Sequence, residues 1–482
     1  MTLRVKLAGH TVDREALQVS GTSSPETLPA AYARISRSPK SIETLRREAL
    51  ADISTARKLN KRVVFDYGHA SVAEHCVFNF DIEGVSRLAI ETIEHSRLCS
   101  YTEKSQRYVK LGADYIIPAE VLELGLGDKF KALLELQNTS YTRLYDGLRA
   151  VGRTAKQAAE DARYVTSLAT TSQLGMTINA RNLEGMIRRL LRSDLAEVRE
   201  IGSRLLSCGQ HLAPSLVRHI EIGRAAPIES ADHMEILQVP KYPTSLPYSE
   251  SLNLDIISQY NGVVHLVDYT TDGDSVICAA LLHHHEINVD VPFYRCRTYT
   301  RCMPAHHRRE IIWGALQRLS KHDPVPREFE LAGATFDIVL SAACYGQLKR
   351  HRMATLIPQA YNVMFGDWTV PPAIAQAKDT DLVKIFDRVM LESAALWDEI
   401  YERNPQAAPY ALTQAHHRRV LLAMNCRELY HFGRLRLDMA AQWDIREIAE
   451  RMVSLLRRRF PLALMGVCGK DKFNEVWESL GG

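Results

Sequence analysis

Two stretches of the chain resemble each other and decide the fold. Residues 179–200 read NARNLEGMIRRLLRSDLAEVRE, and residues 425–447 read NCRELYHFGRLRLDMAAQWDIRE. Both begin Asn-x-Arg-x-Leu and both end Arg-Glu, at an offset of 425 − 179 = 246 residues. Because similarity at a fixed spacing is the signature of an internal repeat, we predict a duplicated domain of about 240 residues.

Shorter similarities occur in the same order. HSR at 95–97 corresponds to RHR at 350–352, and RVKLAGHT near residue 4 corresponds to VHLVDYT near residue 264. Residues 239–255, VPKYPTSLPYSESLNLD, carry three prolines and no helical period, which is typical of a linker. We therefore predict a first domain over 1–240, a linker over 241–257 and a second domain over 258–482.

Composition fits a soluble globular protein. The 482 residues exceed the roughly 100–200 that one domain usually takes. Hydrophobic residues make up 46% and charged residues 24%, which excludes wholesale disorder, and a net charge of +3 gives no global attraction to nucleic acid. No apolar run approaches the roughly 18 residues that span a bilayer, and the first residues lack a signal peptide's apolar core. We expect a cytoplasmic protein without a membrane or nucleic-acid partner.

The cysteines indicate a reducing environment. There are nine, scattered along the chain, and none forms a CxxC pair. Such a set is typical of reduced thiols and not of a disulfide framework or a zinc site. The run His283, His284, His285 and Glu286 is a weak metal candidate, because consecutive residues do not easily converge on one ion. We predict no metal.

Each half mixes strands and helices. Residues 76–83 alternate strictly, with Cys76, Phe78, Phe80 and Ile82 pointing one way, which predicts a half-buried strand. Residues 41–60 are predicted to be helical, and residues 419–460 to form one or two long helices. The fold class is therefore α/β or α+β, with a small mixed sheet packed with long helices in each half. No GxGxxG or GKS/T motif supports a Rossmann site or a P-loop.

Two polar stretches could bind anions. In HSRLCSYTEKSQRY, residues 95–108, two hydroxyls beside an arginine suit a phosphate, although a solvated turn has the same composition. In QLKRHR, residues 347–352, Arg350, His351 and Arg352 could hold a polyanionic cofactor or lie on a solvated surface.

The segment from Asn425 to Gln442 is more informative. Asn425 and Arg436 are eleven residues apart, close to three turns at about 3.6 residues per turn, so they share a helical face. His431 is four residues after Arg427 and is its neighbour on the surface. Such a face is functional or a salt-bridged exterior, and not core.

Together these motifs resemble the flavin-dependent thymidylate synthases, whose signature is RHR-x-x-S-x-N/S-E/Q-x-S-x-R-Y. GHASVAEHCVFNFDIEGVSR from residue 68, with the SxTExSxRY stretch that follows it, is similar to that family's core. The Asn425 segment is similar to the family's C-terminal helix, NxRxLxxFLxLRxDxxAQWEIR. The resemblance covers most of both halves and is weakest over 205–260 and 365–410. It implies two tandem thymidylate synthase-like domains.

The two halves depart from the signature in complementary ways. The first half has Thr92, His95 and Ser96 where the family has Gln and the first two residues of RHR, but it keeps SxxExSxRY. The second half keeps Gln347 and RHR, then reads MATLIPQAYN. The family's nucleotide-contacting arginine, sixteen residues before the helix Asn, corresponds to Arg163 in the first half and to Pro409 in the second.

The family assembles each active site between subunits, and the surviving residues divide along that line. We therefore hypothesise that the two domains became complementary halves of one composite site. Since the family forms tetramers of single domains, the resemblance implies a homodimer of tandem chains.

The resemblance implies C5 methylation of a uridine monophosphate, dUMP or UMP. FAD, methylenetetrahydrofolate and NADPH would take part, and Arg436 would be catalytic beside the pyrimidine. The implied nucleotide-binding residues are Gln347, Arg350, Glu103, Ser105, Arg107, Arg163 and Arg436. The implied flavin-binding residues are Arg350, His351, Arg352, Asn425, Arg427, His431, Ser71 and Glu103.

Two alternatives stay open. A UMP-specific methylase of the kind found in nucleoside-antibiotic biosynthesis would share the same residues. A flavin- or nucleotide-binding regulator without turnover is a different class. His431 in place of the usual Asn, and Ala440 in place of a common His, put two flavin contacts in doubt.

Overall fold

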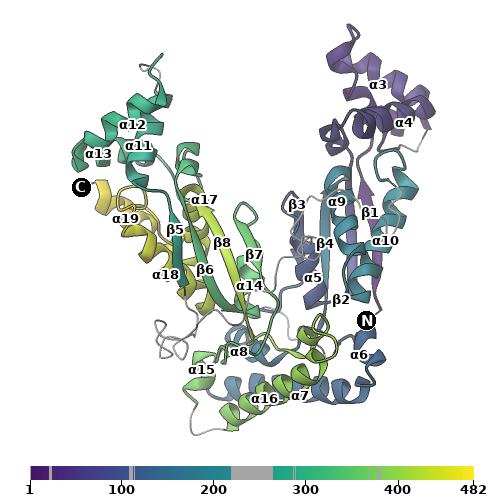
Figure 1. Cartoon of the computed structure of the whole chain (residues 1–482), viewed down its shortest axis with the longest axis vertical. Coiled ribbons are helices and arrows are strands. Elements are labelled where there is room, and N and C mark those ends of the chain that lie inside the picture. Colours follow the sequence, from purple (N-terminus) through teal and green to yellow (C-terminus); the bar gives the residue numbers. More distant parts are fainter. Residues whose placement is uncertain are drawn as a thin grey trace. The chain divides into compact units, whose positions relative to one another are not determined.

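The computed structural model describes residues 2–20, 24–107, 112, 114–218, 264–285, 287, 289–366, 368–377 and 381–481 (Figure 1). The linker predicted over 241–257 lies outside these residues. The described chain forms two compact units. The first takes its residues from Met1–Leu252 and Asp379–Leu412, and the second from Asn253–Lys378 and Thr413–Gly482.

The first unit is built on a four-stranded antiparallel sheet. Its order is β1-β2-β4-β3, formed by β1 (Arg4–His10), β2 (Val77–Ser86), β4 (Thr171–Asn179) and β3 (Cys99–Glu103). The predicted alternation in β2 is confirmed, since Phe78, Phe80 and Ile82 are at most 1% exposed. Gly84 (φ +66°) lies at a register shift in this strand, and an added Cβ there would lie 2.4 Å from the carbonyl oxygen of Thr2. Only glycine fits so close a backbone approach.

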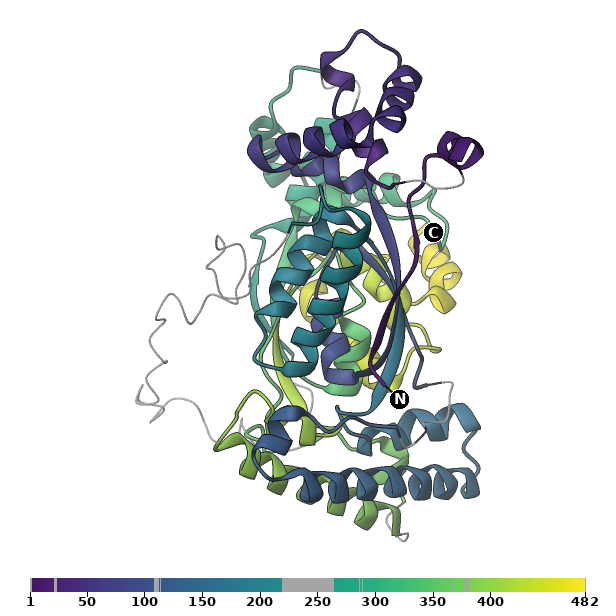
Figure 2. The same ribbon diagram turned by 90° about the vertical axis from the view of Figure 1, so that its right-hand side faces the viewer.

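Helices α9 (Ala180–Leu191) and α10 (Ala196–Leu212) lie side by side in this unit (Figure 2). The helix predicted over 41–60 is two helices, α3 (Ile42–Ala51) and α4 (Ile53–Lys61). The break occurs at Asp52, whose carboxylate accepts a hydrogen bond from the Thr55 backbone N–H at 3.0 Å and so caps α4. The other elements up to Glu123 are α1 (Arg14–Ser20), α2 (Thr27–Tyr32), η1 (Ile35–Arg37), η2 (Arg62–Asp66), η3 (Ala70–His75), α5 (Arg87–Glu94) and α6 (Ala119–Glu123).

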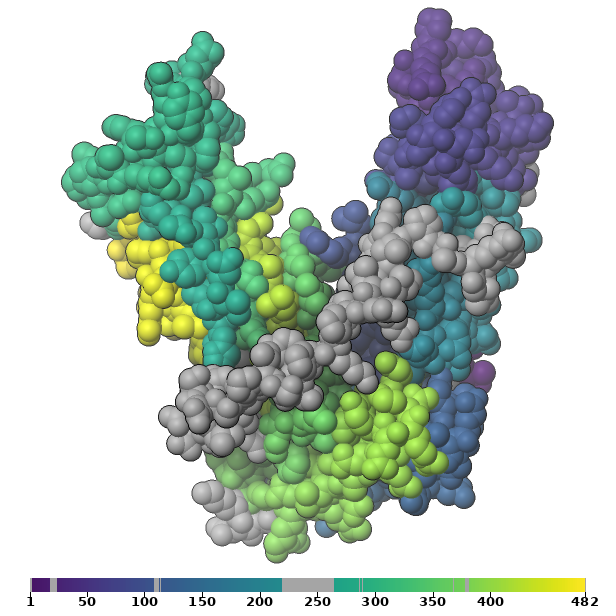
Figure 3. Space-filling model, viewed as in Figure 1, coloured from purple at the N-terminus to yellow at the C-terminus, as the bar shows by residue number. Residues whose placement is uncertain are grey.

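A helical layer in the same unit draws on both sequence halves. It contains α7 (Gly127–Ala150), α8 (Ala155–Ala162), η4 (Arg163–Val165), α16 (Asp381–Tyr401) and η9 (Ala408–Ala411). Gln137 of α7 donates from Nε2 to the Ser393 hydroxyl of α16 at 2.9 Å, in a buried contact. Figure 3 shows the atoms of α16 directly against those of α7. The compact units therefore do not follow the sequence repeat at residues 379–412.

The second unit repeats the sheet. Its order is β5-β6-β8-β7, formed by β5 (Val264–Tyr269), β6 (Gly333–Ser341), β8 (His417–Asn425) and β7 (Thr355–Pro358), all paired antiparallel. Its helical elements are α11 (Gly273–His284), α12 (Phe293–Cys302), α13 (Ala305–Leu316), η8 (Arg327–Leu331), α14 (Ala342–Leu348), α15 (Pro372–Ala375), α17 (Cys426–Arg436), α18 (Trp443–Arg457), η10 (Lys470–Lys472) and α19 (Phe473–Gly481).

The prediction of helix throughout 419–460 is wrong for its first residues. Residues 417–425 form β8, a strand bonded on both sides, to β6 and to β7. Val420, Leu422 and Met424 are buried in alternation with the more exposed Leu421, which is a strand period. Helix begins only at Cys426, because Asn425 is its cap.

Equivalent backbone hydrogen bonds show that the two sheets have the same local structure. The Arg87 and Leu88 N–H groups donate to the carbonyls of Thr170 and Leu168. The Ala342 and Ala343 N–H groups make the same two bonds, to His416 and Gln414. The offsets are 342 − 87 = 255 and 416 − 170 = 246, which match those of the sequence motifs. The predicted fold class, two tandem mixed domains of strands and helices, is confirmed.

None of the helices in the described part of the chain has the length and apolarity that a bilayer crossing requires.

Candidate functional site

Helix α17 is positioned by its first residue. Asn425 ends β8 and caps α17, with its side-chain oxygen accepting from the Glu428 backbone N–H at 2.8 Å. Asn is among the best N-cap residues because it satisfies an N–H that has no partner inside the helix. Asn179 caps α9 in the first unit in the same way, at 2.9 Å from the N–H of Asn182. The shared Asn-x-Arg motif therefore begins each helix after its strand.

Arg436 lies at the end of α17 and is held by two acceptors. Its Nε donates to His351 Nε2 at 2.9 Å, and its Nη2 donates to the Gln347 carbonyl oxygen at 3.0 Å. Both acceptors come from α14 or the loop after it, so the RHR segment and the α17 arginine meet as predicted. Two fixed acceptors orient the guanidinium plane of a half-buried arginine.

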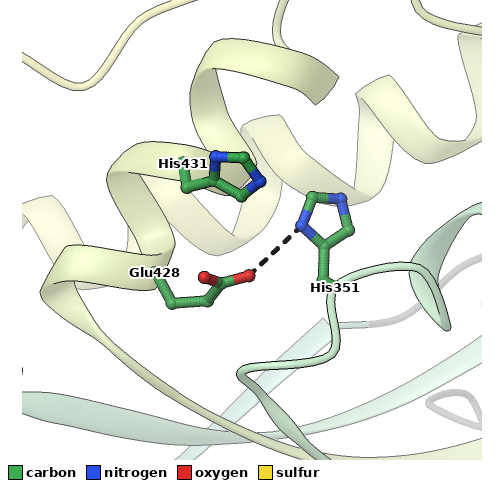
Figure 4. A group of neighbouring side chains, drawn as sticks. All are labelled: His351, Glu428 and His431. Atoms are coloured by element: carbon green, nitrogen blue, oxygen red, sulfur yellow. Dashed lines mark ion pairs between the residues drawn. The ribbon is translucent and has the colours of Figure 1, made fainter. Parts of the chain in front are cut away.

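His351 is buried behind Arg436, with 3% exposure. Burial lowers the pKa of His351 well below its ordinary value, and the positive charges of Arg436 and His431 act in the same direction. The imidazole is therefore neutral. Its Nδ1 faces Glu428 Oε1 at 3.4 Å, while His431 lies at the surface beside it (Figure 4).

Gln347 offers a buried acceptor. Its Nε2 donates to Gln442 Oε1 at 3.0 Å. Its own Oε1 is buried, and within the residues that the structure describes no hydrogen-bond donor reaches it. Buried polar atoms are normally satisfied, so this oxygen is available to a hydrogen-bond donor of a bound molecule.

The other basic residues of the motif differ in their surroundings. Arg350 is exposed and Arg352 half-buried, on either side of His351. Arg427 instead donates from Nε to the Val325 carbonyl oxygen at 2.9 Å and pairs with Glu330 at 3.2 Å. Its guanidinium is thus turned toward the segment that carries η8, and its predicted flavin contact stays a prediction.

The first unit gathers a second basic group. Arg87 donates to Glu103 Oε1 at 2.6 Å, with both side chains buried. Arg107 forms an ion pair with Glu160, which lies three residues before Arg163 in the sequence. Arg163 is 5% exposed, and its Nη2 finds no acceptor among the described residues. Burial lowers the pKa of Arg163, and the positive charges of Arg87 and Arg107 act in the same direction, against Tyr164 and Glu160.

Such a group is suited to a phosphate dianion. A multiply charged oxyanion supplies the acceptors and the opposite charge that clustered guanidinium groups need. Ser105 is half-buried beside it, and its hydroxyl accepts from the Arg107 N–H at 3.3 Å. Ser71, in contrast, is exposed on η3.

Sequence reasoning missed several residues of these sites: Arg87, Gln106, Glu160, Glu428 and Gln442. Gln106 is 4% exposed, and neither polar atom of its side chain meets a partner in the described part of the chain. Glu428 had a readable signal, because an N-cap Asn followed three residues later by Glu is a capping pattern. The others depend on chain segments meeting in the fold.

The two predicted sets occupy different units. Ser71, Glu103, Ser105, Arg107 and Arg163 belong to the first unit. Gln347, Arg350, His351, Arg352, Asn425, Arg427, His431 and Arg436 belong to the second.

The residues of the second unit fit a flavin dinucleotide. Arg350 and Arg352 supply positive charge that suits a pyrophosphate. The nine cysteines are all free thiols. Burial raises the pKa of Cys278 to about 11 and that of Cys426 higher still, so neither is a thiolate at neutral pH.

Comparison with known proteins agrees with this arrangement. The family model described as "Thymidylate synthase complementing protein" matches residues 19–215 and again residues 265–462. A flavin-dependent thymidylate synthase of Clostridium tetani is 31% identical over 226 residues, which is 44% of this chain and 89% of that protein. A UPF0159 protein of Thermoplasma acidophilum is 23% identical over 492 aligned positions, which is 91% of this chain and 93% of that protein.

Among solved structures, the UMP/dUMP methylase PolB from Streptomyces cacaoi, bound with 5-Br dUMP, is similar at 20% identity. The TM-score is 0.35, and the match covers 45% of this chain and 93% of that chain.

The family match confirms the expected resemblance and, with it, the predicted enzyme class, a flavin-dependent methyltransferase of the thymidylate synthase type. One match falls on each half of the chain, and the two sheets repeat one topology. The chain therefore belongs to the family of thymidylate synthase complementing proteins.

Proposed function

We propose that this protein methylates C5 of a uridine monophosphate nucleotide, dUMP or UMP, with FAD as cofactor and methylenetetrahydrofolate and NADPH as co-substrates. The observation that carries the proposal is the fixed guanidinium of Arg436, held by His351 and by the Gln347 carbonyl next to the unsatisfied amide oxygen of Gln347.

Arg436 would act on the pyrimidine by its charge. Negative charge on N3 and O4 makes C5 more nucleophilic, and a guanidinium beside these atoms stabilises that charge. An arginine already oriented by two hydrogen bonds needs little reorganisation when the charge develops. Gln347 would accept from N3–H and so fix the ring's orientation.

Arg107, Arg163 and Ser105 would bind the 5′-phosphate. Glu103, in its buried pair with Arg87, would hold the segment that carries Ser105. Arg350, His351, Arg352, Asn425, Arg427 and His431 would hold the flavin, with Ser71 and Glu103 from a first domain. A reduced flavin bound there would supply the transfer of the one-carbon unit and hydride that the protein's side chains cannot perform.

We infer from the complementary losses that one nucleotide site draws on both sets of residues. The strand pairing shows which residues of the second domain stand where the first domain has its predicted phosphate-binding residues. Ser100 and Thr355 pair with Thr177 and Ala423, so 355 − 100 = 255. At that offset Glu103, Ser105 and Arg107 correspond to Pro358, Ala360 and Asn362. The second domain therefore lacks a phosphate site of its own, and a homodimer of tandem chains would supply it.

The test is an assay of purified, flavin-loaded protein with dUMP and UMP side by side, with methylenetetrahydrofolate and NADPH. Formation of a 5-methyl nucleotide with NADPH oxidation supports the proposal, and the ratio of kcat/KM values identifies the substrate. A UMP-only product would assign the UMP-specific methylase. Nucleotide binding without any turnover over hours would overturn the proposal in favour of a regulator.

A further inference from the structure

We propose that Glu428 is a positioning residue for this reaction: it sets the tautomer of His351, which in turn orients Arg436. The inference rests on the proposed function for its kinetic readout, and on the contacts of three side chains for its structural one.

The first step is the hydrogen bond between Arg436 and His351. An arginine side chain only donates, so His351 Nε2 must accept, and the atom that accepts carries no proton. His351 is buried and neutral, and a neutral imidazole has one N–H. That proton therefore lies on Nδ1.

The second step concerns Nδ1. It is buried and forms no hydrogen bond within normal geometry in the described residues. The Glu428 carboxylate faces it at 3.4 Å from the first turn of α17 (Figure 4). Contacts of this length in an unliganded site often shorten when substrate binds. A carboxylate at this place favours the Nδ1–H tautomer, as an acceptor beside one ring nitrogen does in other histidine pairs.

The third step asks whether the groups around His351 form a metal site instead. His351, Glu428 and His431 each offer a ligand atom, and these atoms lie within 4.8 Å of one another, so the group could also hold a metal ion. A metal on Nδ1 would require its lone pair and would move the ring proton to Nε2. That proton would then point at the Arg436 N–H that Nε2 now accepts. The bond from Arg436 therefore favours a proton-ordering role over a metal site.

The fourth step is the pattern of loss in the first domain. The α9 and α17 offset of 246 makes Asn182 the counterpart of Glu428. Arg189 takes the place of Arg436, since it donates to the Thr92 carbonyl oxygen and, at 2.8 Å, to the Ser96 hydroxyl. The α5 and α14 offset of 255 makes Ser96 the counterpart of His351. Glu428 and His351 are thus replaced together, by Asn182 and Ser96, whereas the arginine and the capping Asn179 are kept. Residues that act as a unit are expected to be lost as one.

The experiment compares Glu428→Gln with Glu447→Gln, an exposed glutamate of α18 paired with Arg451, as the matched control. We expect E428Q to lower kcat for uridylate methylation about 10-fold to 100-fold, by misplacing Arg436, with little change in nucleotide KM. E447Q should keep wild-type kinetics. Circular dichroism and thermal melting of both variants verify folding.

A double-mutant cycle shows whether Glu428 acts through His351. In His351→Gln, the side-chain carbonyl can accept from Arg436 without any tautomer. We expect E428Q to have little further effect on kcat in this background. An undiminished effect of E428Q there would overturn the proposal, as would wild-type kcat in E428Q alone.

A second readout does not depend on turnover. Long-range proton–nitrogen spectra of protein with ¹⁵N-labelled histidine report the tautomer, and H351Q assigns the signal. We expect Nδ1–H in the wild type and a mixture with Nε2–H in E428Q. If the wild type lacks methylation activity but shows this shift, the proposed function fails and the proton ordering stands. An Nε2–H tautomer in the wild type, or stoichiometric zinc binding that E428Q abolishes, would overturn the inference.

Discussion

At the scale of single residues, two arginines carry the proposed chemistry in different ways. Arg436 is half-buried and oriented by His351 and the Gln347 carbonyl. Arg163 is almost fully buried, with an Nη2 that meets no acceptor in the described chain. In the proposed function the first acts on a ring and the second binds a fixed anion, so their variants should differ in kinetics.

Replacing Arg436 by Gln should lower kcat for uridylate methylation about 10²-fold to 10³-fold, because a donor aimed at developing charge acts mainly in the transition state. Arg436→Lys should recover only part of this loss, since an ammonium lacks the planar fork. Steady-state assays measure both, with the exposed Arg451→Gln as the control. Unchanged kcat in R436Q would show that the catalytic assignment is wrong.

Replacing Arg163 by Gln should instead raise the KM for nucleotide. Loss of one charged hydrogen bond to phosphate costs about 1.5–3 kcal/mol, or roughly a tenfold to hundredfold weaker binding. Isothermal titration with the nucleotide measures this without turnover. Arg143→Gln, exposed on α7, is the control. Equal affinity of R163Q and wild type would place the phosphate elsewhere.

At the scale of elements, the strand-to-helix junction is used twice. Asn179 and Asn425 each end a strand and cap the next helix, with N–H contacts of 2.9 and 2.8 Å. Ser86 and Ser341 cap α5 and α14 in the same manner and also donate to Glu197 and Asp444, both at 2.6 Å. These four junctions fix where the site residues emerge from each sheet.

We expect Asn179→Ala and Asn425→Ala each to lower the free energy of unfolding by about 1 kcal/mol, the usual cost of losing an N-cap. Urea unfolding followed by circular dichroism measures the change. If Asn425 also contacts flavin, only N425A will weaken flavin binding in a fluorescence titration. Equal flavin affinity in both variants would leave Asn425 a purely structural residue.

The start of β8 carries a pH-sensitive pair. Burial lowers the pKa of His416 to about 3 and that of His417 to about 4, and the charge of His417 adds to the effect on His416. Unfolded histidine titrates near 6.5, so between pH 6.5 and about 4 the unfolded chain binds more protons than the folded one. The free energy of unfolding should therefore fall with decreasing pH, by about 2 kcal/mol per histidine at pH 5.

Urea unfolding between pH 7.5 and 5 measures this slope. The first domain has Thr170 and Thr171 at the equivalent positions, 416 − 246 and 417 − 246. Replacing both histidines by Thr should make the free energy of unfolding less dependent on pH below pH 6.5, even if the variant is less stable overall. The exposed His265→Gln serves as the control. An equally steep slope in the double variant would assign it to other groups.

At the scale of the whole molecule, the proposal is that tandem chains form a homodimer whose sites combine a first domain with a second. Light scattering tests the mass against the 54.4 kDa of one chain. Arg107→Gln and Arg436→Gln should each inactivate the protein. Mixing the two by co-expression should restore about a quarter of wild-type activity if a site draws on two chains, because half of the dimers are mixed and each has one intact site of two.

The control for this mixture is the double variant R107Q/R436Q combined with wild type. In its mixed dimers every between-chain site has one damaged half, whereas a site within one chain survives in the wild-type partner. With random pairing, between-chain sites leave about a quarter of wild-type activity in the second mixture, from the wild-type dimers alone, whereas within-chain sites leave about a half. No restoration in the first mixture, together with about half of wild-type activity in the second, would place each site within a single chain.

The sequence by itself determined the duplication, the family and the alternating strand at 76–83, and it predicted the candidate site residues. Repeats, alternation and motif spacing are local or pairwise patterns that survive in one dimension. It did not separate β8 from α17, because seven residues that alternate before a helix continue an apolar pattern without a break, and only pairing with β6 and β7 makes them a strand.

Only the tertiary structure decided which groups meet. His351, Glu428 and Arg436 are up to 85 residues apart, and no local pattern gives the direction of a hydrogen bond between them. The same holds for the neighbourhood of Arg87, Arg107 and Arg163, and for α16, which packs on α7 across the sequence repeat. Burial and charge at these places depend on packing, since they arise from segments that only the fold brings within a few ångströms of one another.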